Sequence, residues 1–143
     1  MAMNLVARQS VIIDAPSTKV WKALTDPEAI RQYLFGTEAV SDWKAGSQII
    51  YKGVWQGKPY EDKGTVLKVV PGRLLETTYW SGISGLPDTL ENRKKVTYEL
   101  LSKDLQTTIT VTQDNNATEE EKSHSEQNWK IVLEGLKKLL ETR

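Results

Sequence analysis

The 143-residue sequence contains no cysteine and a single histidine, His124. Without cysteine there can be no disulfide bond, no thiol catalysis and no thiolate metal site. A site with two histidine ligands, as is common for zinc, is excluded as well, and the acidic residues do not form the clusters that a carboxylate-only site needs. We therefore expect neither a metal ion nor another cofactor.

An excess of charge of one sign and long apolar runs are missing too. Nineteen Lys and Arg residues balance nineteen Asp and Glu residues, so we expect no nucleic-acid partner. No apolar run approaches the roughly 20 residues of a membrane helix, and the first six residues lack the features of a signal peptide. These absences predict a cytoplasmic protein without membrane insertion. The length of 143 residues and the lack of a linker-like shift in composition predict a single domain over residues 1–143.

Turn residues divide most of the chain into short segments with the two-residue period of β-strands. The expected strands are 5–13, 39–42, 48–55, 60–70, 73–81, 95–101 and 106–113. Two short helices interrupt them: one over 17–24, and one that starts at Asp26-Pro27-Glu28, where aspartate suits the N-cap and proline the first turn. From residue 38 onward, the spacing of the turns predicts an antiparallel meander.

One face of this predicted sheet is apolar and aromatic. The residues on that face are Ile49, Tyr51 and Trp55; Thr65, Leu67 and Val69; Val96, Tyr98 and Leu100; and Ile109 and Val111. For the strand 73–81 the pattern is ambiguous, because Glu76 and Trp80 share one face while Leu75 and Tyr79 share the other. The sequence does not decide which pair faces inward.

The last part of the chain predicts a long amphipathic helix over 123–143. Five aliphatic side chains lie on the same side as Trp129: Val132, Leu133, Leu136, Leu139 and Leu140. Thr118 and Glu121 have the spacing of a capping box, so the helix is expected to begin near Thr118. Ser125 lies close to Trp129 on this wheel, whereas His124 points away from it, which argues against a Ser-His-Asp triad.

The order of these motifs resembles the SRPBCC, or START-like, superfamily. More narrowly, it resembles the bacterial homologues of the C-terminal domain of the heat-shock chaperone ATPase activator. The motifs that carry the resemblance are Asp14-Ala15-Pro16, Val20-Trp21, Leu24-Thr25-Asp26-Pro27-Glu28, Trp43-Lys44-Ala45-Gly46, Gly64-Thr65-Val66, Pro71-Gly72-Arg73-Leu74 and Trp129…Leu136. Ser47 and Tyr33 stand where the family often has glycine and tryptophan, differences that bear on the shape of a pocket rather than on the fold.

The resemblance implies an α+β helix-grip fold, in which a curved antiparallel sheet of about seven strands wraps around the C-terminal helix. Two short helices after the first strand close one end, and an elongated apolar cavity commonly lies between sheet and helix. Five tryptophans and five tyrosines against one phenylalanine favour rings with a polar atom on such a cavity wall. The candidate ligand-binding residues are Tyr51, Trp55, Trp80, Tyr98, Ser125 and Trp129.

Three functional hypotheses follow. The leading one is the binding of a small, largely apolar molecule, such as a flavonoid-like or polyketide-like aromatic. The second is a chaperone partner with a role in the stress response that acts through its outer surface, although the sequence shows no counterpart of the separate N-terminal domain of full-length activators. The third is an aromatase-, cyclase- or hydrolase-type enzyme, which requires an inward acid or base that the sequence does not identify. The sequence also leaves open whether side chains fill the cavity.

Overall fold

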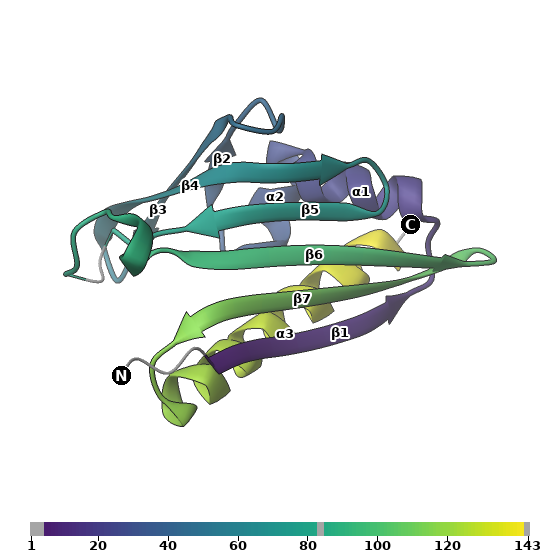
Figure 1. Cartoon of the computed structure of the whole chain (residues 1–143). Coiled ribbons are helices and arrows are strands. Elements are labelled where there is room, and N and C mark those ends of the chain that lie inside the picture. The colour runs from purple at the N-terminus through teal and green to yellow at the C-terminus, as the bar shows by residue number, and fades with distance from the viewer. Residues whose placement is uncertain (1–4, 83–84, 142–143) are drawn as a thin grey trace.

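Seven antiparallel strands form a curved sheet in the order β1-β7-β6-β5-β4-β3-β2. The computed structural model describes residues 5–82 and 85–141. The long C-terminal helix α3 crosses one face of the sheet, and the short helices α1 and α2 lie on that same face at one end (Figure 1). This is the helix-grip arrangement that the resemblance implied.

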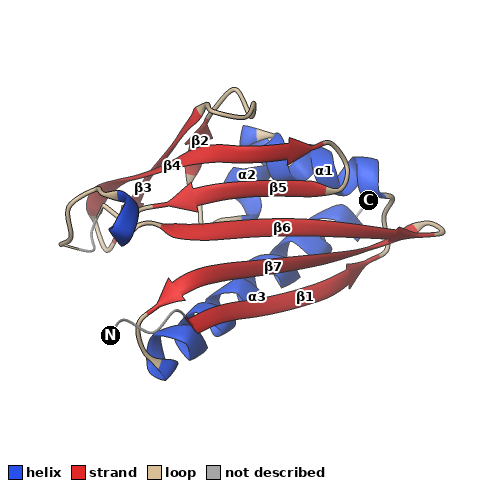
Figure 2. Ribbon diagram, viewed as in Figure 1, coloured by secondary structure: helices blue, strands red, loops and turns tan. Residues whose placement is uncertain are grey.

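The elements follow the predicted order (Figure 2). The strands are β1 (Leu5–Ile13), β2 (Glu38–Val40), β3 (Gln48–Trp55), β4 (Lys58–Val70), β5 (Leu74–Tyr79), β6 (Lys94–Lys103) and β7 (Gln106–Asn116). The helices are α1 (Ser17–Thr25), α2 (Pro27–Tyr33), α3 (Glu119–Glu141) and the short 3₁₀ helix η1 (Leu90–Asn92), which was not predicted. Among the described residues, no helix is both long and apolar enough to cross a membrane.

The start of α3 is fixed by the predicted capping box. The backbone N–H of Glu121 donates to Thr118 Oγ1 at 3.1 Å. In return, the Glu121 carboxylate accepts from the backbone N–H of Ala117 at 3.2 Å, one residue earlier than in the usual box. The helix therefore begins at Glu119, close to its predicted start.

The prediction for the inward face of β4 is wrong over most of the strand. It placed Thr65, Leu67 and Val69 inside, but Leu67 is 43% exposed. The pairing of β4 with β5 shifts register between Val66 and Lys68, and such a bulge reverses the face on which alternate residues lie. Before the bulge, the inward residues are the other alternating set, which includes Asp62 and Val66, both buried.

The densest part of the core surrounds the C-terminal half of α3. Leu133 and Leu136 are almost fully buried there and pack in one cluster with Ile109 and Val111 of β7. The apolar faces predicted for β6 and β7 are therefore correct. The N-terminal half of α3 is packed less closely, and the candidate site lies beneath it.

A candidate ligand-binding cavity

A cavity of about 710 Å³ lies between the concave face of the sheet and the N-terminal half of α3. Its walls are formed by strands β3 to β7, by α3, and by the segment that follows α2. Ligand sites in proteins commonly measure about 300–1,000 Å³. Toward Leu24 and Ile30 the space narrows to a void of about 20 Å³, room for little more than one water molecule. The space between sheet and helix is thus open at one end and filled at the other.

Several tyrosines line the sheet side of the cavity, among them Tyr51, Tyr79 and Tyr98. The rings of Tyr51 and Tyr79 meet edge to face with their centroids 6.0 Å apart, and Tyr98 meets Trp129 in the same way at 5.9 Å. Burial raises the pKa of all three phenols well above the usual range, and the charge of Asp62 raises that of Tyr51 further. The hydroxyls therefore remain neutral near pH 7.

These hydroxyls differ in their hydrogen bonds. The Tyr79 hydroxyl donates to Asp62 Oδ2 at 2.5 Å. The hydroxyls of Tyr51 and Tyr98 have no partner among the described residues. Because both residues line the cavity, water or a ligand there can satisfy their hydroxyls.

Asp62 is the one carboxylate among the described lining residues, and it is only 7% exposed. Besides the bond from Tyr79, its Oδ1 accepts the backbone N–H of Gly82 at 2.7 Å. A Cβ atom at position 82 would lie 2.1 Å from the Glu61 carbonyl oxygen, so only glycine can bring this N–H so close. The chain is thus built to hold a buried carboxylate at this point.

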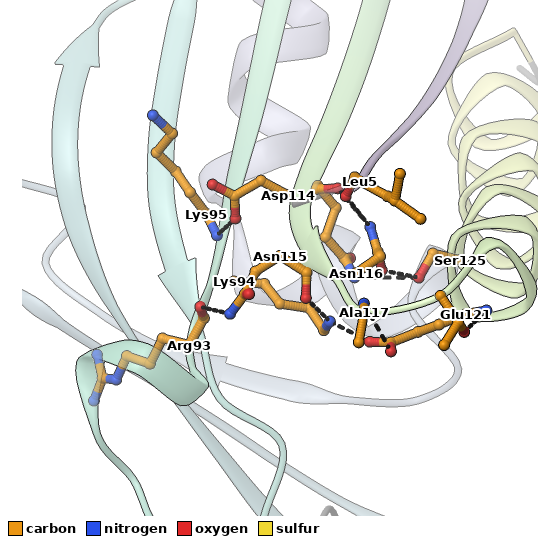
Figure 3. Close-up of polar contacts among 12 residues, drawn as sticks. Leu5, Arg93, Lys94, Lys95, Asp114, Asn115, Asn116, Ala117, Glu121 and Ser125 are labelled. Carbon is orange, nitrogen blue, oxygen red and sulfur yellow. Dashed lines mark hydrogen bonds and ion pairs between the residues drawn. The ribbon is translucent and has the colours of Figure 1, made fainter. Parts of the chain in front are cut away.

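On the helix side, a series of hydrogen-bonded polar side chains holds α3 to the sheet. The Trp129 indole N–H donates to Gln113 Oε1 at 2.8 Å, and Gln113 Nε2 donates to Ser125 Oγ at 3.2 Å. The Ser125 hydroxyl donates to Asn116 Oδ1 at 3.3 Å, and the Asn116 amide also donates to the carbonyl of Leu5 at 2.9 Å (Figure 3). These groups satisfy one another and fix the orientation of the Trp129 ring.

An ion pair ties β6 to the first turn of α3. Lys94 Nζ lies 2.5 Å from Glu121 Oε1 and donates to the carbonyl of Asn115 at 2.9 Å (Figure 3). The hydrogen bond from Lys94 holds the pKa of the Glu121 carboxyl below its usual range. This ion pair holds the N-terminal end of α3, where the helix faces the cavity rather than a packed core.

Exposed side chains surround the mouth of the cavity, among them Phe35, Val54, His124 and Asn128. His124 is exposed as predicted, but the prediction that it points away from the cavity is wrong. The cavity borders a broad flank of α3 that extends from Val132 round to His124, so it reaches beyond the apolar stripe on which that prediction rested.

Comparison with known proteins places this architecture in a family. Residues 14–141 match the family model described as Activator of Hsp90 ATPase homolog 1-like protein (AHSA1). The chain belongs to the AHSA1-like family. No curated protein sequence matches the AHSA1-like chain described here.

Several solved structures resemble this AHSA1-like chain. ChR145 from Cytophaga hutchinsonii is 50% identical, with a TM-score of 0.86 over 99% of this chain and 97% of that one. The Aha1 dimer from Colwellia psychrerythraea is 20% identical, with a TM-score of 0.74 over 96% of each chain. DynU16, a protein from the dynemicin biosynthetic locus, is 22% identical, with a TM-score of 0.79 over 96% of this chain and 47% of its own. The last two likenesses concern the fold alone.

The AHSA1-like fold brings four of the predicted site residues to the cavity wall: Tyr51, Tyr98, Ser125 and Trp129. Trp80 does not line the cavity, because β5 turns Tyr79 inward and Trp80 to the opposite side, where its indole N–H donates to the Leu86 carbonyl at 3.1 Å. Trp55 belongs to β3, but its side chain lies outside the described part of the structure.

Asp62 and Gln113 also line the cavity, although neither was predicted to do so. Gln113 continues the alternation of Ile109 and Val111, so extending the inward face of the predicted strand by one step would have found it. The inward position of Asp62 could not be predicted, because the bulge in β4 has no clear signature in the sequence.

Proposed function

We propose that this protein binds a small, largely apolar molecule in the cavity between the sheet and α3. The observation that carries the proposal is a space of about 710 Å³ lined by two tyrosines, Tyr51 and Tyr98, whose hydroxyls have no hydrogen-bond partner among the described residues. Apolar burial supplies the affinity, and a few polar groups orient the ligand. Flat aromatics of the flavonoid or polyketide kind suit the aromatic walls.

The residues proposed to contact the ligand are Tyr51, Tyr98 and Trp129, with Ser125 at the helix side. The Ser125 hydroxyl already forms hydrogen bonds with Gln113 and Asn116, so we expect it to contribute little to ligand binding. The proposed site needs no cofactor. A ligand that buries roughly 300 Å² of apolar surface gains several kcal/mol from burial, but the cost of association leaves an affinity near the micromolar range.

Native mass spectrometry of the gently purified protein tests this proposal. We expect an additional mass of a few hundred daltons in part of the population, which disappears when the protein is denatured. A protein that carries no such mass and gives no saturable tryptophan quenching with a library of flat aromatics would contradict the proposal.

A chaperone-linked role is the second candidate, favoured by the description of the matching family model. It would use the outer surface and leave the cavity without a direct part. Co-purification with a heat-shock chaperone, retained when the cavity is blocked by mutation, would favour this role over ligand binding.

An enzyme of the aromatase, cyclase or hydrolase class is the third candidate. No inward acid or base could be identified from the sequence, but the buried Asp62 with its Tyr79 partner is a candidate. Turnover of a bound aromatic that is lost in Asp62→Asn would favour this candidate.

A further inference from the structure

The carboxylate of Asp62 is held inside a cavity whose other walls are mostly neutral. It is 7% exposed and accepts two protein hydrogen bonds, one from Tyr79 and one from Gly82. An ionised carboxylate offers about four acceptor positions, so the described residues leave two positions of Asp62 unused. Burying a charge without enough hydrogen bonds or a counter-charge costs free energy. These unused acceptor positions are therefore where a hydrogen-bond donor in the cavity would gain most.

No cationic side chain in the described part of the chain occupies these positions. Among the described residues, Asp62 forms no ion pair, and neither lysine nor arginine lines the cavity. His124 is the one side chain on the described wall that can become cationic, and it is exposed at the mouth. The tyrosines near Asp62 remain neutral at physiological pH, so they cannot balance its charge.

The surroundings of Asp62 also suit a cation. Its neighbour Tyr79 meets Tyr51 edge to face at 6.0 Å, so two aromatic rings border the cavity beside the carboxylate. The face of an aromatic ring attracts a cation within about 6 Å. On the helix side, Gln113, Ser125 and Trp129 offer no such binding point, because they satisfy one another.

We infer that Asp62 anchors a protonated amine, and that the ligand class of the cavity is a small aromatic or otherwise apolar molecule with a primary or secondary amine. The apolar part of such a ligand lies against Tyr98 and Trp129, and its ammonium group donates to the free acceptor positions of Asp62. This inference rests on the proposed function and adds the charge of the ligand to it. It predicts a cavity that selects against anions of the same shape.

Three probes that differ only in the charge of one group test the inference. They are 2-naphthalenemethylamine, 2-naphthalenemethanol and 2-naphthoic acid, which are cationic, neutral and anionic near pH 7. Titration of the wild-type protein by calorimetry should give a dissociation constant for the amine about tenfold or more below that of the alcohol, as expected for a charged hydrogen bond. The acid should bind more weakly than the alcohol.

Two variants separate the role of Asp62 from that of net charge. Asp62→Asn should reduce the preference for the amine over the alcohol to less than about threefold, because the buried charge is gone. Glu61→Gln removes the same charge from the neighbouring exposed residue and should leave the preference unchanged. Should Asp62→Asn fail to fold, Tyr79→Phe serves instead, because it removes one donor to the carboxylate and should preserve or increase the preference for the amine.

The outcomes distinguish the two proposals. Equal binding of the amine and the alcohol by the wild-type protein, or an amine preference that persists in Asp62→Asn, overturns the inference but leaves the proposed function intact. Absence of binding by all three probes overturns the inference, and together with a negative result in native mass spectrometry it overturns the proposed function as well.

Discussion

The tyrosine hydroxyls around the cavity differ in whether the protein satisfies them. The Tyr60 hydroxyl shares a hydrogen bond of 2.6 Å with the buried Thr37 hydroxyl, whereas the Tyr98 hydroxyl has no hydrogen-bond partner among the described residues. Gly53, which pairs with Tyr60 across β3 and β4, makes room for this ring, since a Cβ there would lie 2.4 Å from the Tyr60 hydroxyl. One hydroxyl thus supports the fold, and the other is free for a ligand.

This difference predicts opposite effects for the same chemical change. Tyr60→Phe leaves Thr37 without its partner and should lower the free energy of unfolding by about 1 kcal/mol or more. Tyr98→Phe and Tyr51→Phe should change it by less than about 0.5 kcal/mol, but each should weaken a hydroxyl-bearing ligand by about 0.5–1.5 kcal/mol. Urea unfolding and ligand titration measure the two quantities. A stability loss in Tyr98→Phe equal to that in Tyr60→Phe would contradict this assignment.

The sequence was informative about single residues wherever the alternation of a strand continued without interruption. Tyr51, Tyr98, Ile109 and Val111 were assigned to the inward face, and the structure places them there. Asp62 could not be assigned, because the bulge in β4 depends on pairing with β5 rather than on the residues of β4 alone.

Among the elements, α3 has two halves with different contacts. Its C-terminal half is packed into the core through Leu136, while its N-terminal half is held mainly by polar groups. At the edge of the sheet, the Glu126 carboxylate accepts the backbone N–H of Arg8 in β1 at 3.0 Å, and the Glu141 carboxylate accepts that of Asp14, the residue after β1, at 2.7 Å. The helix thereby satisfies donors on an edge strand that would otherwise be open to pairing with another chain.

Two truncations on α3 should therefore have very different costs. Leu136→Ala removes a side chain that is 1% exposed and should lower the free energy of unfolding by about 2–5 kcal/mol. Ile131→Ala, on the same helix but 57% exposed, should lower it by less than about 1 kcal/mol. Denaturant unfolding of both variants measures the difference. Equal losses would show that α3 does not pack on the sheet through its predicted apolar stripe.

The bounds of the elements were largely predictable, because turn residues and caps act locally. The capping box at Thr118 and the proline at the start of α2 are examples. The inward face of the predicted strand 73–81, which contains β5, was not predictable, because Tyr79 and Trp80 put an aromatic residue on each face. What decides it is the antiparallel pairing of Leu75 with Tyr98, which no local pattern reveals.

For the whole molecule, the buried tyrosines predict a loss of stability in alkali. Tyr33, Tyr51, Tyr79 and Tyr98 all have a pKa raised above the usual value, chiefly by burial. Above about pH 10 the unfolded chain releases phenolic protons that the folded protein keeps. The stabilising contribution of each tyrosine is therefore complete below about pH 10 and decreases above it by up to about 1.4 kcal/mol per pH unit.

Comparison of the wild-type protein with Tyr98→Phe isolates one of these contributions, since lysines titrate alike in both. Urea unfolding between about pH 9 and pH 11 should show a free energy of unfolding that declines less steeply with pH in Tyr98→Phe, the difference in slope approaching that of one proton near pH 11. Parallel declines in the two proteins would mean that the Tyr98 hydroxyl ionises as readily in the folded state as in the unfolded state.

The most direct test of ligand binding is to fill the cavity and measure the affinity again. Val96 lines the cavity on β6 and is 3% exposed, whereas the neighbouring Lys95 is exposed on the other face. Titration with flavone, followed by tryptophan fluorescence, should give saturable quenching with micromolar affinity in the wild-type protein and in Lys95→Phe, and at least tenfold weaker binding in a folded Val96→Phe. Equal affinity in Val96→Phe and Lys95→Phe, or no saturable quenching in the wild-type protein, would contradict binding in this cavity.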